Sequence, residues 1–142
     1  MNHLNNIDLR TDKYSHSYIK NEIVNVCFAT SRGELNSDEG LNAYNAGDAL
    51  ITGSTGSQWC VSRDRFNAKY EALPPLNHGE NGTYRNKPIP VLAKQMNTPF
   101  SIARSEKGDV LQGFAQDWLI QYAPGDYGIV TNMRFQLVYR KA

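Results

Sequence analysis

The feature that most constrains the fold of this chain is an internal repeat. When the sequence is aligned with itself at an offset of 69 residues, nine of the 25 positions from Ala46 to Tyr70 match their partners in 115–139, without a gap. Average amino-acid usage gives roughly one or two identities over such a stretch. The shared pattern is Asp-x-Leu-Ile, then a Gly, then Arg-Phe-x-x-x-Tyr. We therefore expect two homologous halves with the same fold.

A weaker repetition lies upstream. The pattern Tyr18-x-x-x-x-Ile23-x-x-Val26 is similar to Tyr84-x-x-x-x-Ile89-x-x-Leu92, at an offset of 66. Between the two halves, Leu73-Pro74-Pro75 is followed by Asn-Gly punctuation, which is typical of a linker. We expect a polar N-terminal tail over 1–13, a degenerate first repeat over 14–72, a linker over 73–82 and a second repeat over 83–142, together forming one compact unit.

Strand-like runs dominate both halves, and the helices are short. Ser62 is placed to cap a helix over 63–70, and Asn132 to cap one over 134–137. A third short helix is predicted over 37–45, where Leu41 and Tyr44 are three residues apart. The predicted fold class is α+β, mainly β: a tandem duplication of a small curved sheet or partly open barrel with short helices, packed about a pseudo-twofold axis.

Composition excludes several classes of protein. The chain has 142 residues and a formal net charge of +1, so it has no general attraction to nucleic acid, and we expect no nucleic-acid partner. It has no run of about 18 apolar residues and no apolar signal-peptide core near its start. We expect a cytoplasmic protein with no membrane segment.

The run Asp117-Trp118-Leu119-Ile120-Gln121-Tyr122-Ala123-Pro124-Gly125-Asp126-Tyr127-Gly128 resembles the PGDYG family, a group of mostly bacterial proteins named for this motif. Residues 84–96 fit the opening of the same family, and the resemblance covers 83–142. The second half is also similar to a small phage-associated domain that contains Gly-Asp-Trp and ends in Phe-x-x-x-Tyr, although Gln116 stands here in place of that Gly. In the first half Ala49 stands in place of the Trp, and 55–59 replace the motif loop. The resemblance implies a fold and the location of a site, and no particular reaction.

The motif loop and its strand supply the candidate site. Asp126 offers a hydrogen-bond acceptor, and Trp118, Tyr122 and Tyr127 offer flat surfaces for stacking. Our leading hypothesis is a non-catalytic module that binds a small polar or nucleotide-like ligand, and its predicted binding residues are Tyr84, Trp118, Gln121, Tyr122, Asp126 and Tyr127. In the alternative interpretation the loop is a tight hairpin whose aromatic residues fill the core.

Two other functions stay open. One is a protein-interaction or assembly module of phage or bacterial-conflict origin. The other is an enzyme that uses Asp117 or Asp126 as an acid or base. Asp48 recurs in the first half at the position of Asp117, which also fits a local bond from each Asp to its own turn. We favour a non-enzymatic role and assign no catalytic residue.

Metal and cofactor motifs are missing from the sequence. His3, His16 and His78 lack metal-ligand spacing, and the chain has no phosphate-binding loop or dinucleotide fingerprint. Cys27 lies between Val26 and Phe28, so we predict it in the core, and Cys60 has no obvious activating base nearby. We predict no metal and no cofactor.

Overall fold

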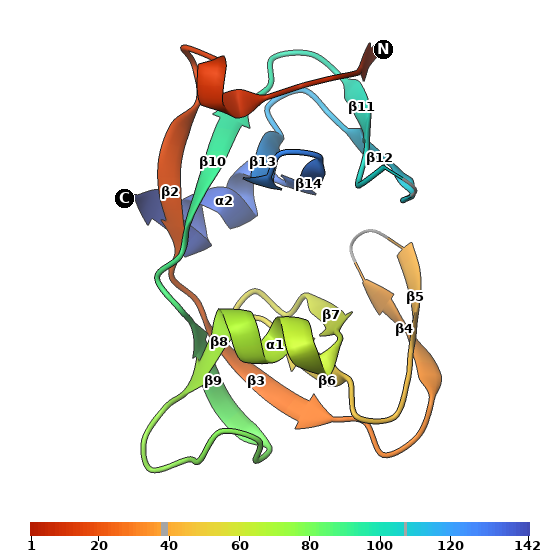
Figure 1. Ribbon diagram of the computed structural model, residues 1–142, viewed down its shortest axis with the longest axis vertical. Coiled ribbons are helices and arrows are strands. Elements are labelled where there is room, and N and C mark those ends of the chain that lie inside the picture. The colour runs from red at the N-terminus through yellow and green to blue at the C-terminus, as the bar shows by residue number, and fades with distance from the viewer. Residues whose placement is uncertain (38–39, 107) are drawn as a thin grey trace. The chain divides into compact units, whose positions relative to one another are not determined.

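Strands β2 (His16–Lys20) and β3 (Ile23–Phe28) are separated by only two residues, yet they belong to different sheets. The chain divides into two compact units, shown in Figure 1. Unit 1 comprises Met1–Lys20 and Pro90–Ala142, and unit 2 comprises Asn21–Ile89. Each unit therefore contains strands from both halves of the sequence.

The computed structural model describes residues 1–37, 40–106 and 108–142. Over these residues the chain is mainly β, as the sequence predicts, and it has two short α-helices. The sheets in the same part of the chain are open, and none closes into a barrel. No helix among the described residues is long and apolar enough to cross a membrane.

Unit 1 is built on a five-stranded sheet with α2 (Asn132–Val138) on one face. The strand order is β14 (Asp126–Val130), β13 (Trp118–Ala123), β10 (Pro90–Gln95), β2 and β15 (Tyr139–Lys141). A second sheet of unit 1 contains β1 (Asn2–Leu4), β11 (Phe100–Ala103) and β12 (Val110–Gly113). The 3-10 helix η1 (Leu9–Thr11) contacts β10. Strand β1 runs parallel to β11.

Unit 2 repeats the first of these arrangements. Its five-stranded sheet has the order β7 (Gln58–Val61), β6 (Ala49–Thr52), β3, β9 (Gly82–Asn86) and β8 (Tyr70–Ala72). Helix α1 (Arg63–Lys69) lies between β7 and β8 in the sequence, as α2 lies between β14 and β15. A separate hairpin is formed by β4 (Gly33–Ser37) and β5 (Gly40–Tyr44).

The registers of the two sheets show which residues correspond. Tyr84 on β9 pairs with Val24, and Tyr18 on β2 pairs with Val91, so the two tyrosines occupy the same place in their sheets. Each tyrosine packs edge-on at 4.9 Å against a helix phenylalanine, Phe66 or Phe135. The register differs by one residue from the alignment predicted upstream. Val26 lies opposite Ile51 as Ala93 lies opposite Ile120, so Val26 corresponds to Ala93 and not to Leu92.

The inner face of each sheet, defined here as the face that packs on the helix, holds an apolar core. In unit 1 this core contains Tyr18, Ala93, Trp118, Ile120 and Phe135. In unit 2 it contains Val24, Val26, Ala49, Ile51, Phe66, Tyr70 and Tyr84. Burial of these side chains is the main term that stabilises the units.

The opposite, outer faces differ between the units. In unit 1 the outer face is apolar, because Leu119 and Tyr127 pack with Leu9 and Phe100 from the covering segments. In unit 2 the outer side chains of β3 are Ile23, Asn25 and Cys27, and all three are exposed. The core location predicted for Cys27 is therefore wrong. Strand alternation directs Val26 inward and Cys27 outward, which two apolar neighbours in the sequence do not reveal.

Two helix predictions also need correction. The N-cap of α2 is Thr131, whose hydroxyl accepts a hydrogen bond from the backbone N–H of Arg134. Asn132 is the first helical residue, and Ser62 occupies the N-cap position of α1 as predicted, with no side-chain cap hydrogen bond. The helix predicted over 37–45 is absent from the described part of this segment, which forms β5 and the end of β4, and residues 38–39 lie outside the described residues. Three-residue spacing of two apolar side chains is weak support for a helix when strand pairing is available.

The two segments predicted as a tail and a linker pack on the units. Residues 1–13 include β1 and η1, and Leu9 is completely buried. Residues 73–82 lie on the inner side of unit 2, where Leu76 packs against the core and the His78 ring contacts Phe66 and Tyr84. The segment before β2 thus covers the outer face of its sheet, whereas the segment before β9 packs on the inner side.

Candidate functional site

The PGDYG motif forms the tight hairpin between β13 and β14. Gly125 has φ of 83°, a conformation that an L side chain rarely adopts. Ala123 pairs with Asp126, and the register shifts between Gln121 and Ala123, which marks a bulge. The local sequence dictates this turn, because Pro and Gly supply the two backbone geometries that it needs.

Trp118 and Tyr127 lie in the core of unit 1. The Trp118 ring stacks on Phe135 with centroids 3.7 Å apart, and its Nε1 donates a hydrogen bond of 2.9 Å to Oδ1 of Asn132. The Tyr127 hydroxyl donates to the backbone carbonyl of Ile7. Both side chains therefore have their polar atoms satisfied from within unit 1.

Gln121 is 3% exposed and ties the N-terminal segment to the sheet. Its Oε1 accepts a hydrogen bond of 2.7 Å from the backbone N–H of Leu9, and its Nε2 donates at 3.2 Å to Oδ1 of Asp8. Asp8 also binds Arg10, with Oδ2 2.7 Å from a guanidinium nitrogen. The Arg10 guanidinium holds the pKa of Asp8 well below its usual range, chiefly through this hydrogen bond.

Tyr84 belongs to unit 2, while the other five predicted residues belong to unit 1. It is completely buried. Its hydroxyl donates 2.7 Å to the carbonyl of Glu80 and accepts 2.8 Å from the backbone N–H of Gly79. These bonds hold the 73–82 segment against the core.

A small groove brings Gln121 and Tyr122 together with residues that sequence reasoning did not select. Its volume is about 140 Å³, and Tyr122 is 39% exposed. Arg10 and Ser17 line this groove and were not predicted from the sequence. Arg10 lies in the segment predicted as a tail, and no sequence pattern marks Ser17. The lining residues are Arg10, Ser17, Pro90, Val91, Leu92, Gln121, Tyr122, Ala123 and Pro124. Asp126 is half-buried at the start of β14 and is outside this lining.

The repeated aspartates hold their own turns. Oδ2 of Asp48 accepts a hydrogen bond of 2.9 Å from the backbone N–H of Asn45. Oδ2 of Asp117 accepts one of the same length from Phe114. These equivalent bonds support the local role that the repeat suggested. Within the described residues no group of three His, Cys, Asp or Glu side chains is arranged to hold a metal ion.

The hairpin and its flanking strands agree with a family match. A family model described as PGDYG protein matches residues 40–140. The chain belongs to this family. Comparisons with curated proteins and with solved structures find no match. The family match begins in the first half of the chain, well upstream of the 83–142 segment in which the sequence analysis placed the resemblance.

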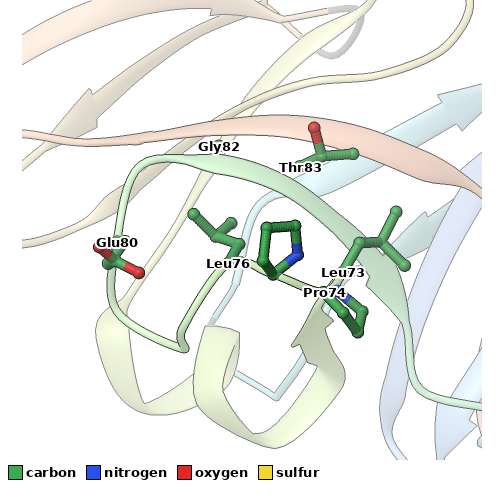
Figure 2. Close-up of a pocket in the computed structure, with 7 residues that line it drawn as sticks. Leu73, Pro74, Leu76, Glu80, Gly82 and Thr83 are labelled. Carbon is green, nitrogen blue, oxygen red and sulfur yellow. The ribbon is translucent and has the colours of Figure 1, made fainter.

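A larger pocket of this PGDYG family member lies in unit 2, in the segment predicted as a linker. The Leu-Pro pocket is lined by Leu73, Pro74, Pro75, Leu76, Glu80, Gly82 and Thr83, and its volume is about 540 Å³. Figure 2 shows Leu76 between Glu80 at one end and Leu73 with Pro74 at the other. Leu73 and Leu76 beside two prolines form an apolar group in the sequence. This group is the sequence feature that could have indicated a packed segment in place of a linker.

The outer surface of α2 is the other feature outside the motif. Met133 and Leu137 are 78% and 66% exposed, and they are four residues apart, so they are neighbours on the helix. The corresponding residues of α1 are Asp64 and Ala68, both exposed. We call Met133 and Leu137 the α2 surface. One of these two positions is acidic in unit 2 and the other holds the small side chain of Ala68, so the fold itself does not require large apolar side chains there.

Proposed function

We propose that this protein is a non-catalytic interaction module that binds a protein partner through the α2 surface of unit 1. The observation that carries the proposal is the exposure of Met133 and Leu137 at positions where α1 has Asp64 and Ala68. Single exposed apolar residues are normal on a protein surface. An adjacent pair at helix spacing, in one of two matching helices, is typical of a surface that another protein covers.

The placement of the motif residues supports a binding role over a reaction. Trp118, Gln121, Tyr127 and Tyr84 are buried and bonded inside their own units, so their side chains have little surface left for a substrate. Asp117, one of two carboxylates considered for catalysis, accepts a bond from its own turn. An acid or base in a reaction needs a substrate within hydrogen-bond reach.

The test gives α2 the residues of α1. We would compare the wild type with the double variant Met133→Asp, Leu137→Ala in affinity capture from bacterial extract. Leu41→Ala is the matched control, since Leu41 is 65% exposed and lies in unit 2. A partner captured by wild type and control and lost from the double variant supports the proposal. Equal capture by all three, together with self-association that is the same for all three, contradicts it.

The second candidate function is binding of a small polar ligand in the groove of unit 1. Gln121 and Tyr122 of the predicted site line it, and Arg10 and Ser17 add a cation and a hydroxyl. Its volume of about 140 Å³ is below the roughly 300 Å³ at which ligand pockets usually begin. A ligand here is therefore the size of an amino acid or a small sugar, and a nucleotide would stay largely outside.

This second function is tested by ligand-observed NMR with free amino acids, monosaccharides and nucleosides. Tyr122→Ala and Arg10→Ala are expected to abolish the signal of any ligand bound in the groove. Tyr14→Ala is the control, because Tyr14 is an exposed tyrosine of unit 1 outside the groove. A signal that survives both groove variants removes this candidate.

We propose in addition that the two units arose by tandem duplication, with an intact motif in the second copy and a degenerate one in the first. The matching strand orders and the matching places of Tyr18 and Tyr84 support a common origin. In this view β2 and β9 are exchanged between the copies. Packing about a pseudo-twofold axis and a cytoplasmic location stay predictions.

A further inference from the structure

The α2 surface and the Leu-Pro pocket have complementary chemistry. The α2 surface offers two flexible apolar side chains, Met133 and Leu137, on a helix whose only charged residue is Arg134. The Leu-Pro pocket is apolar, and its only charged lining residue is Glu80. We infer that the partner of the α2 surface is a second copy of this chain, whose Leu-Pro pocket receives Met133 or Leu137. The inference rests on the proposed interaction function.

The pocket is suited to side chains from a helix. Its volume of about 540 Å³ lies in the range of roughly 300–1,000 Å³ that buries most of a small ligand, so two aliphatic side chains have room. The prolines and Leu73 supply apolar contacts, and Pro74 and Pro75 are exposed in this unit. Burying a Met or Leu side chain removes a large apolar surface from water, which makes each a suitable anchor for a contact.

Charge favours this pairing over contact of α2 with α2. Over the printed sequence, unit 1 has 9 basic and 6 acidic residues, and unit 2 has 6 basic and 8 acidic residues. Two copies joined by their α2 surfaces would bring two units with an excess of basic residues together. The α2 surface against the Leu-Pro pocket instead brings unit 1 of one copy to unit 2 of the other, which has an excess of acidic residues and carries Glu80 in the pocket. Opposite charges around an apolar contact select the partner and speed its encounter.

The geometry of such a contact has a consequence for assembly. Different patches of the two copies meet, so the interface is heterologous: the copy that uses its α2 surface keeps a free pocket, and the copy that uses its pocket keeps a free α2 surface. Heterologous contacts build rings when the rotation closes, and open chains when it does not. We therefore expect association beyond a dimer that increases with protein concentration and weakens in high salt.

The experiment uses sedimentation velocity of the full chain over a range of concentrations. The wild type is expected to show a sedimentation coefficient that rises with concentration. Met133→Asp removes the α2 surface, and Leu76→Glu places a charge in the pocket, so each variant alone is expected to stay monomeric. Leu76 also packs on the unit 2 core. Pro74→Glu, at an exposed lining position, is therefore a second pocket variant, and circular dichroism confirms that each variant is folded.

Mixing the variants gives the decisive result. Met133→Asp retains a pocket and Pro74→Glu retains an α2 surface, so an equimolar mixture is expected to form a heterodimer that grows no further. A mixture of Met133→Asp with Leu137→Asp, both altered on α2, is the control and is expected to stay monomeric. A wild type that is monomeric throughout, or a heterodimer that fails to form while the wild type assembles, overturns the inference.

The outcomes also separate this inference from the proposed function. If the wild type is monomeric but another protein is captured in an α2-dependent way, the second copy is the wrong partner and the interaction module stands. If neither sedimentation nor capture changes when α2 is altered, both fail. If assembly is lost on substitution of α2 but is unchanged by the pocket substitutions, α2 binds a different surface of the second copy. The inference as stated would then be wrong.

Discussion

Tyr122 lies across Gly128, so close that a methyl group on Gly128 would be 2.7 Å from the tyrosine hydroxyl. In unit 2 the same two places hold Gly53 and Trp59, in the reverse order. A methyl group on Gly53 would be 2.8 Å from the Trp59 ring. Each hairpin therefore pairs one aromatic ring with one glycine on the other side of the hairpin. The glycine leaves room for the ring, which in turn covers the backbone that the glycine exposes.

The first prediction compares the two glycines. Gly53→Ala should cost about 1–3 kcal/mol of the free energy of unfolding, because the new methyl group meets both Trp59 and a carboxylate oxygen of Glu22. Glu22 is buried and accepts hydrogen bonds from Ser54, so it has little freedom to move. Gly128→Ala should cost less than about 1 kcal/mol, since Tyr122 is 39% exposed and its ring can shift more readily than the buried carboxylate of Glu22. Urea denaturation of the two variants measures both values, and equal losses would contradict the prediction.

The second prediction concerns Asp48 and Asp117. Each accepts a 2.9 Å hydrogen bond from the backbone N–H three residues earlier. Asp48→Ala and Asp117→Ala should therefore lower the free energy of unfolding by similar amounts, about 1 kcal/mol each. Asparagine at either position should recover most of the loss, because its side-chain oxygen can still accept the bond. Thermal or chemical denaturation gives the comparison. A stability loss at Asp48 with none at Asp117 would reopen a chemical role for Asp117.

The sequence predicts the mainly-β class and the hairpin of the motif, because both depend on local signals. Alternation of apolar and polar residues predicts strands, and a Pro-Gly pair predicts a turn, from neighbouring residues alone. The placement of β2 in the sheet of unit 1 and of β9 in the sheet of unit 2 has no such signal. The residues near Lys20 and Ile89 do not indicate which sheet the next strand joins. Pairing with strands that are distant in the sequence determines it.

The candidate site could be predicted only in part, because several apparent mismatches between the halves compensate each other in space. Trp118 stacks on Phe135 in unit 1, whereas its counterpart in unit 2, Ala49, has no ring that could stack on Phe66. There Phe28, on the neighbouring strand β3, packs on Phe66 with its ring centroid 5.3 Å away. In the alignment, the tryptophan is a distinctive residue of the second half. In the structure it fills the core of unit 1 at a place that Phe28 fills in unit 2. Trp118→Ala would therefore test folding before it tested ligand binding.

The third prediction concerns acid stability. Lys94 lies 2.8 Å from a carboxylate oxygen of Asp12, and this hydrogen bond lowers the pKa of Asp12. A carboxyl group whose pKa is lowered by folding stabilises the protein above its unfolded pKa of about 4, and that stability is lost as the pH falls through the folded pKa. The melting temperature of the wild type should therefore fall more steeply below about pH 4 than that of Asp12→Asn.

The control for this comparison is Asp64→Asn, an exposed aspartate on α1. It should retain the wild-type slope of melting temperature against pH. Asparagine at position 12 can still accept the hydrogen bond from the backbone N–H of Tyr14, so the variant isolates the loss of charge. Parallel slopes for wild type and Asp12→Asn between pH 5 and pH 2 would show that the Asp12–Lys94 pair does not contribute in this range.

The fourth prediction concerns the two cysteines, which lie on either side of Leu50 on the outer face of unit 2. Cys27 pairs with Leu50 across one strand boundary, and Cys60 pairs with it across the next. Two strand spacings amount to about 10 Å, and the Cα atoms of a disulfide are at most about 7 Å apart. Mild oxidation of the folded protein should therefore leave both thiols unpaired within the chain.

The same two cysteines should react at different rates. Cys27 is exposed, whereas Cys60 is half-buried, and burial together with the nearby Asp48 raises the pKa of the Cys60 thiol. A higher pKa leaves less thiolate, which is the form that attacks an alkylating reagent. Iodoacetamide at neutral pH should modify Cys27 several-fold faster than Cys60, as followed by mass spectrometry of the two peptides. Cys27→Ser should leave only the slow reaction, and equal rates of the two cysteines in the wild type would contradict the prediction.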